Sequence, residues 1–257
     1  MRLYLAPLAG HYLKQIHRPL CILDLDDDEM RTRERLAGLY DRTGNHSAAD
    51  SEKGEARKYQ VLAERYLPMF DRVLVCAPDD AQRLQSKYPG AHFAVVPNGY
   101  RAGAPAPRTN QDDTLRLLFV GTLGYFPNED AARFLCREIV PALRRLSRRN
   151  IRVDLVGGGP SEAVLALGQD ADIHVHGYVE DLTSCYATAD IAVVPVRAGG
   201  GTRIKILEAF AQGVPVVATR VGAEGIDAAD GMHLMLADDP ESFARACLGL
   251  KDDAQKA

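Results

Sequence analysis

The residues with the clearest chemical potential are three glycines and the two basic residues that follow them, in Gly199-Gly-Gly-Thr-Arg-Ile-Lys205. Glycines let the backbone approach a ligand closely, and the free N–H groups and dipole at a helix start favour negative charge. Arg203 and Lys205 fall in the first turn of the expected helix, where a cation is unfavourable unless an anion binds. The pattern predicts a site for a nucleotide diphosphate; the alternative is a solvated loop before an ordinary amphipathic helix.

A strand before the glycines and a helix after them must position this site. Residues 190–196 are a short apolar run of the kind buried in a parallel sheet. The helix is expected from about Thr202 to Gln212, ending at Gly213 before a second strand over 214–219. Its apolar face carries Ile206, Leu207 and Phe210, and its other side carries Lys205, Glu208 and Gln212. Glu208, one turn beyond the start, is placed to accept hydrogen bonds from ligand hydroxyls.

The run from Gly199 to Thr219, followed by Val221-Gly-Ala-Glu-Gly-Ile226, resembles the donor-site signature of GT-B glycosyltransferases of family 4 type (glycosyl transferases group 1). The resemblance extends over most of residues 112–250 and implies a retaining enzyme that uses a nucleotide sugar. The family often carries two glutamates separated by seven residues; Glu208 matches the second, which contacts the donor ribose, and Gly200 stands at the first. The resemblance implies that the donor diphosphate is bound by Gly121, Thr122, Gly200, Gly201, Thr202, Arg203 and Lys205. It implies that the nucleobase is bordered by Gly177, Tyr178 and Val179.

Strands and helices alternate through residues 115–250, which predicts an α/β fold with a parallel sheet covered on both faces. Ligands of such sheets bind at the carboxyl ends of the strands. Loops carrying Gly121, Gly177–Val179, Gly199–Lys205 and Glu224 should gather there, although Glu224 has the alternative of being an exposed loop acid. Helices are also expected over Glu129–Ser147, with a kink or break at Pro141, and over Glu180–Ala189.

The expected organisation is GT-B-like: a partial N-terminal α/β lobe on the acceptor side over 1–100, a linker over 101–113, and a complete Rossmann-like C-terminal lobe over 114–257. In the first lobe, charged helices are expected over 29–67, with a break at 43–47 and the second helix from Glu52 to Leu67. A full N-terminal lobe of this family would have several more βα units before residue 19. Compared with the family the lobe is shortened: either the chain is a fragment, or its start is misassigned, or the protein works without a full lobe. A partner chain that completes the lobe is a further expectation.

Two groups of residues invite a metal interpretation, and each has a structural alternative. Asp24, Asp26, Asp27 and Asp28 cluster at a strand end, where acids also favour the start of the next helix. His174 and His176 share one face of a strand, but no third ligand is evident. We expect no metal and no cofactor. The glycines at 157–159 lack the spacing of a dinucleotide fingerprint, which disfavours an NAD dehydrogenase.

Composition and charge bear on whether the protein binds nucleic acid, where it resides and whether it crosses a membrane. A net charge of -4 gives no electrostatic argument for nucleic acid. Five dispersed cysteines indicate reduced thiols and a cytoplasmic setting. No run approaches the length of a membrane span, and the apolar part of Met1–Gly10 is too short for a typical signal peptide. Local basic patches leave open a peripheral contact with the inner membrane face.

The expected function is transfer of a sugar, with retention, from a UDP- or GDP-sugar to a glycan, lipid or small-molecule acceptor in glycan or polysaccharide biosynthesis. No catalytic residue is assigned. One alternative is a nucleotide-sugar-binding module that is non-catalytic or depends on a partner chain. Another is a GT-B-shaped epimerase, which would convert the donor with no acceptor present.

Overall fold

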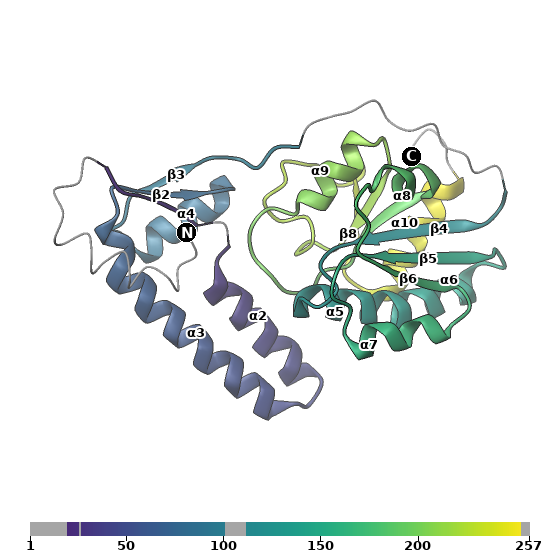
Figure 1. Cartoon of the computed structure of the whole chain (residues 1–257), viewed down its shortest axis with the longest axis horizontal. Helices are drawn as coiled ribbons and strands as arrows, with labels where there is room; N and C mark the ends of the chain where they lie inside the picture. The colour runs from purple at the N-terminus through teal and green to yellow at the C-terminus, as the bar shows by residue number, and fades with distance from the viewer. Residues whose placement is uncertain (1–19, 26, 101–111, 253–257) are drawn as a thin grey trace. The chain divides into compact units, whose positions relative to one another are not determined.

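The computed structural model describes residues 20–25, 27–100 and 112–252, which form two compact units. The first unit runs to Asn98 and includes the short segments Ala198–Thr202 and Glu224–Ile226. The second unit comprises the rest of the described chain (Figure 1). Asp26, the start Met1–Gly10 and most of the expected linker lie outside the described residues.

The first unit is built on a small parallel sheet. Its strands are β1 (Ile22–Asp24), β2 (Arg72–Val75) and β3 (Phe93–Val95), in the order β1-β2-β3. Its helices are α2 (Glu29–Arg42), α3 (His46–Tyr66) and α4 (Pro78–Lys87), with a 3₁₀ turn over Leu67–Met69. Leu23, Leu67 and Val73 are buried at the centre of its core. Burying such side chains from water is what stabilises a small sheet of this kind.

Helix α3 begins at His46, six residues before the expected start at Glu52. The side chain of Asn45 caps it, because Asn45 Oδ1 accepts a hydrogen bond from the backbone N–H of Ala48 at 3.2 Å. The expected break between the two helices is present: Gly44 takes a left-handed φ of 76°.

The second unit contains a six-stranded, all-parallel sheet, as the alternating pattern predicted. The strands are β4 (Leu115–Val120), β5 (Ile151–Val156), β6 (Ile173–Gly177), β7 (Ile191–Val194), β8 (Val216–Ala218) and β9 (Met235–Leu236). Their order is β6-β5-β4-β7-β8-β9. Every residue of β7 and β8 is buried, which explains why both read as continuous apolar runs.

The helices of this unit are α5 (Phe126–Phe134), α6 (Val140–Leu146), α7 (Glu162–Leu165), α8 (Thr183–Thr188), α9 (Ile204–Ala211) and α10 (Pro240–Asp252), with a 3₁₀ turn over Ala166–Gln169. The backbone stays helical from Phe126 to Leu146, so no break occurs at Pro141; instead a π-helical segment, Leu135–Ile139, joins α5 to α6 just before the proline. Helix α8 starts at Thr183 and not at Glu180, because Asp181 Oδ1 accepts from the Thr183 N–H at 2.9 Å in a turn ahead of the helix. No helix in the described ranges has both the length and the apolar character needed to cross a membrane.

Candidate functional site

The strand order of the second unit reverses between the neighbouring strands β4 and β7. From β4 the chain builds outward through β5 and β6, and then crosses to the other side of β4 to build β7, β8 and β9. The loops that follow β4 and β7 therefore leave the sheet in opposite directions, and ligands of open α/β sheets bind at such a switch point. Gly121 and Thr122 follow β4, whereas Arg203 and Lys205 follow β7 at the start of α9.

Lys205 lies at the centre of this place. Its ammonium group donates a hydrogen bond to Asn128 Oδ1 at 3.0 Å and lies 4.5 Å from the centre of the Phe119 ring. It forms no ion pair with any residue that the structure describes. Gly121 packs directly against it: a Cβ added there would lie 2.8 Å from both Lys205 Nζ and Asn128 Nδ2. A side chain at Gly121 would therefore displace the end of Lys205 or the amide of Asn128.

The environment of Lys205 disfavours its charge. Burial of the ammonium group and, to a smaller extent, the charge of Arg203 lower the pKa of Lys205, while the charge of Glu208 raises it; the net result is a pKa of about 7. An anion bound beside Lys205 and the start of α9 would supply the missing negative charge. The sequence placed Lys205 on the polar side of an amphipathic helix, but its charged end is enclosed by Phe119 and Asn128 from elsewhere in the fold.

Asn128 organises the loop after β4. Its Nδ2 donates to the carbonyl oxygen of Thr122 at 3.0 Å, while its Oδ1 accepts from Lys205. The amide therefore joins two of the residues predicted to bind the donor diphosphate. Asn128 lies six positions from Thr122 but 77 positions from Lys205, so no local sequence pattern links the three residues.

Glu208 has a partner that the sequence analysis missed. The hydroxyl of Tyr186, in α8, donates to Glu208 Oε2 at 3.3 Å. Tyr186 is only 2% exposed, and burial, followed by the charge of Glu208, raises the pKa of its hydroxyl. From sequence alone, Tyr186 looked like any aromatic residue of a helix core.

The residues predicted to border a nucleobase lie at the carboxyl end of β6. Gly177 takes a left-handed φ of 67°, and its carbonyl oxygen accepts from the Gly157 N–H at 2.7 Å. Tyr178 is 78% exposed, so its ring is free to stack on a ligand. No hydrogen bond in the described chain joins Gly177, Tyr178 or Val179 to Lys205 or Glu208.

The glycine-rich loop has the conformation expected of glycine. Gly199 and Gly201 take φ values of 131° and 66°, which other residues rarely adopt. Gly200 lies so close to the carboxylate of Asp27 that any side chain there would overlap it. Thr202 Oγ1 is buried and has no hydrogen-bond partner among the described residues. Residues 199–202 group with the first unit, whereas Arg203, which directly precedes α9, groups with the second.

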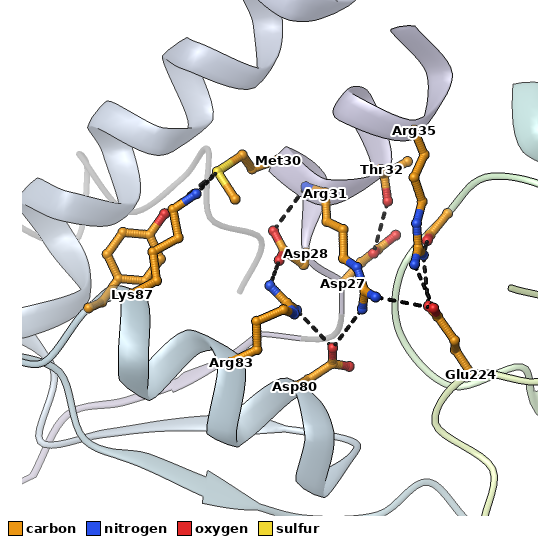
Figure 2. A network of polar contacts seen from close by, with 12 residues as sticks. Asp27, Asp28, Met30, Arg31, Thr32, Arg35, Asp80, Arg83, Lys87 and Glu224 are labelled. Atoms are coloured by element: carbon orange, nitrogen blue, oxygen red, sulfur yellow. Dashed lines mark hydrogen bonds and ion pairs between the residues drawn. The ribbon is translucent and has the colours of Figure 1, made fainter. Parts of the chain in front are cut away.

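Glu224 is the acceptor of an arginine cluster in the first unit, which Figure 2 shows. The guanidinium of Arg35 contacts both of its carboxylate oxygens, at 2.7 and 2.5 Å, and Arg31 adds a third contact at 3.1 Å. Arg35 also donates to the carbonyl oxygen of Gly199 at 2.6 Å. The alternative of an exposed, unengaged loop acid is therefore wrong, because bidentate arginine contacts hold this carboxylate in place.

The acidic cluster at the start of α2 makes structural contacts. Asp28 caps the helix, its Oδ1 accepting from the Arg31 N–H, and its Oδ2 accepts from Arg83 at 2.5 Å. Asp27 accepts from the Thr32 hydroxyl. On β6, His176 Nε2 lies 2.6 Å from Asp154 Oδ1. Over the described ranges, no three His, Cys, Asp or Glu side chains are grouped so that they could hold a metal ion.

The solved structures that this chain resembles are glycosyltransferases of the GT-B class. Sucrose-phosphate synthase from Thermosynechococcus elongatus superposes with a TM-score of 0.75 at 18% identity, over 100% of this chain and 64% of that chain. HepE from Anabaena, solved with UDP and glucose, superposes with a TM-score of 0.68 at 15% identity, over 99% of this chain and 67% of that chain. These likenesses confirm the expected fold class.

The sequence itself assigns the family. The profile of the family described as glycosyl transferases group 1 matches residues 114–253, and the chain belongs to that family. It is 28% identical over 252 residues to the D-inositol 3-phosphate glycosyltransferase of Corynebacterium diphtheriae, covering 87% of this chain and 57% of that protein. It is 27% identical over 202 residues to the phosphatidyl-myo-inositol mannosyltransferase of Mycolicibacterium smegmatis, covering 73% of this chain and 51% of that protein. The chain spans about half the length of the curated relatives it matches.

Proposed function

We propose that this protein transfers a sugar from a nucleotide-sugar donor to an acceptor hydroxyl, with retention of the anomeric configuration. The observation that carries the proposal is Lys205, a half-buried lysine that lies at the switch point of a parallel sheet and forms no ion pair with any residue the structure describes. A donor diphosphate is the anion that fits such a place. Family membership and the likeness to a structure solved with UDP and glucose support this choice of ligand.

The chemistry needs negative charge to be stabilised on the leaving group. As the bond between the sugar and the diphosphate breaks, electrons move onto the phosphate oxygen, and donors aimed at that oxygen lower the barrier. Lys205, Arg203 and the N–H groups at the start of α9 supply this stabilisation in the proposal, without a metal ion. The backbone N–H of Thr122, in the loop after β4, is a further donor in the proposal, whereas the Gly121 N–H already bonds to the Val156 carbonyl oxygen.

The rest of the donor is held by two other groups. Glu208 accepts hydrogen bonds from the ribose hydroxyls, because its carboxylate lies one helical turn beyond Lys205. Gly177, Tyr178 and Val179 border the base, with the exposed ring of Tyr178 available to stack on it. Uridine is the base we propose first, because the neighbouring structures include complexes with UDP.

The acceptor we propose first is an inositol phosphate, because the curated relatives include enzymes named for inositol-containing acceptors. Glycans, lipids and other small molecules are the wider class. We place the reaction in the cytoplasm, with peripheral contact at the inner membrane face where the acceptor is a lipid.

The donor site is tested by calorimetric titration of UDP, GDP and ADP into the 257-residue chain. We expect one nucleotide to bind, and Lys205→Met and Glu208→Gln each to weaken it by about tenfold or more, because each removes a charge-assisted hydrogen bond. The matched control is Glu241→Gln on α10, which alters an acid that is 58% exposed and paired with Arg245. Absence of nucleotide binding by the folded wild-type chain would refute the donor site.

Turnover is tested with the chain, UDP-glucose and D-inositol 3-phosphate. Mass spectrometry should detect the glycosylated acceptor together with free UDP, and NMR should show that the new linkage keeps the donor configuration. Binding without transfer would instead identify a nucleotide-sugar-binding module. Conversion of the donor to an epimer in the absence of acceptor would identify an epimerase.

A further inference from the structure

The hydrogen bond between Tyr186 and Glu208 connects two helices of the second unit that follow two predicted parts of the donor site. Helix α8, which carries Tyr186, comes directly after the segment Gly177–Val179. Helix α9, which carries Glu208, comes directly after the glycine-rich loop. The contact therefore lies between the helix that follows the base segment and the helix whose start faces the phosphates.

The chemistry of the pair fixes the direction of the hydrogen bond. Burial and the neighbouring carboxylate both raise the pKa of Tyr186, so its hydroxyl keeps the proton at neutral pH and donates. A carboxylate has about four lone-pair positions. Tyr186 engages only Oε2, and no other hydrogen bond to the Glu208 carboxylate occurs among the residues that the structure describes. Oxygen lone pairs thus remain free for a ligand.

We propose that Tyr186 is a positioning residue for ribose recognition, which holds the Glu208 carboxylate so that the 2′- and 3′-hydroxyls of the nucleotide can both donate to it. This inference rests on the proposed function. A glutamate side chain loses conformational entropy when it is fixed in one rotamer. If Tyr186 fixes Glu208 already in the folded protein, this entropy is not lost when the nucleotide binds, so binding is tighter. The distance of 3.3 Å is longer than an ordinary O–H···O bond, as is common before a ligand tightens a site.

The test is Tyr186→Phe, which removes one hydroxyl and keeps the buried ring. Dissociation constants are measured by calorimetry for UDP and for 2′-deoxy-UDP, and in parallel for GDP and 2′-deoxy-GDP. We expect the wild-type chain to prefer the ribonucleotide. We expect the variant to lose about fivefold in affinity for the ribonucleotide while its affinity for the deoxynucleotide is nearly unchanged, because one hydrogen bond to a charged group is removed.

Two further variants separate positioning from a general structural effect. Tyr88→Phe removes a hydroxyl of the first unit from a tyrosine that is 4% exposed and bonds to Met30 Sδ at 3.7 Å, and it should leave both affinities unchanged. Glu208→Gln should itself reduce the preference for ribose. Because Tyr186 acts through Glu208, the double variant should lose no more preference than Glu208→Gln alone.

The outcomes are distinct. Circular dichroism verifies that the Tyr186→Phe chain is folded. If this chain keeps the ribose preference of the wild type, or loses affinity equally for the ribonucleotide and the deoxynucleotide, the positioning role is wrong and the proposed function stands. Additive losses in the double variant would likewise overturn it. If the wild-type chain binds none of the four nucleotides, the proposed function fails, and this inference fails with it.

Discussion

Replacing Lys205 by Met should make the protein more stable at neutral and acidic pH. Methionine keeps an unbranched side chain against Phe119 but removes a half-buried ammonium group that has no carboxylate partner within the described part of the chain. Residues that serve a binding site commonly lower stability, so a gain on removal is the signature expected of a ligand-binding lysine.

The size of the stability gain follows from the pKa of Lys205, which falls from 10.5 to about 7 in the folded chain. Between these pH values the unfolded chain binds more protons than the folded chain, so the stability of the wild type rises with pH. The loss of unfolding free energy caused by the lowered pKa of Lys205 reaches its full value, up to about 5 kcal/mol, below pH 7. At pH 9.5 this loss is only about 1 kcal/mol. Loss of the contacts with Asn128 and Phe119 offsets about 1–2 kcal/mol of the gain.

The assay is urea unfolding followed by circular dichroism, since the chain has no tryptophan. The stability gap between Lys205→Met and wild type should narrow by about 3 kcal/mol from pH 6.5 to pH 9.5. The matched control is Lys58→Met in α3, at a lysine that is 72% exposed, which should show no such trend. The reasoning is refuted if Lys205→Met is the less stable protein at pH 6.5, or if the gap does not change with pH.

Three further predictions use the same chain. Binding of UDP at pH 8 should take up close to one proton, because the phosphate raises the lowered pKa of Lys205; calorimetry in Tris and HEPES measures this uptake, which should vanish near pH 6. Glu224→Gln should destabilise the first unit by about 1–2 kcal/mol, because Arg35 loses its charged partner; unchanged hydrogen exchange of that unit would contradict this. Gly157→Ala should cost at least about 3 kcal/mol in thermal unfolding, since its φ is 152° and a Cβ would overlap a carbonyl oxygen, whereas Gly54→Ala, with open space around it, should be neutral or stabilising by up to about 1 kcal/mol.

The sheet of the second unit was predictable because its strands are strongly apolar. The runs that form β4 and β5 are apolar, alternate with helical segments and end at glycines, which is why alternating strands and helices were expected through residues 115–250. The start of α3 was not predictable in the same way. The polar residues after Asn45 show no apolar period, and the helix there depends on a side-chain cap.

The site was predictable as a set of residue types but not as an arrangement. The glycines and basic residues before α9 indicated an anion site, and Lys205 does lie beside Gly121. The enclosure of its ammonium group depends on Asn128, which lies 77 positions away in the chain. Tyr186 was missed for the same reason, since its partner is 22 positions away and no local pattern links the two.

The π-helical segment Leu135–Ile139 bears on how this protein tolerates changes in length. Its wider turn, in which the Val140 N–H bonds to the Leu135 carbonyl, holds one residue more than an α-turn. A single-residue deletion here should therefore leave the buried faces of α5 and α6 in phase, whereas the same deletion within α5 would rotate the following side chains by about 100°. Pro141 suits the wide turn but not a regular one, so shortened versions of this helix should also replace the proline.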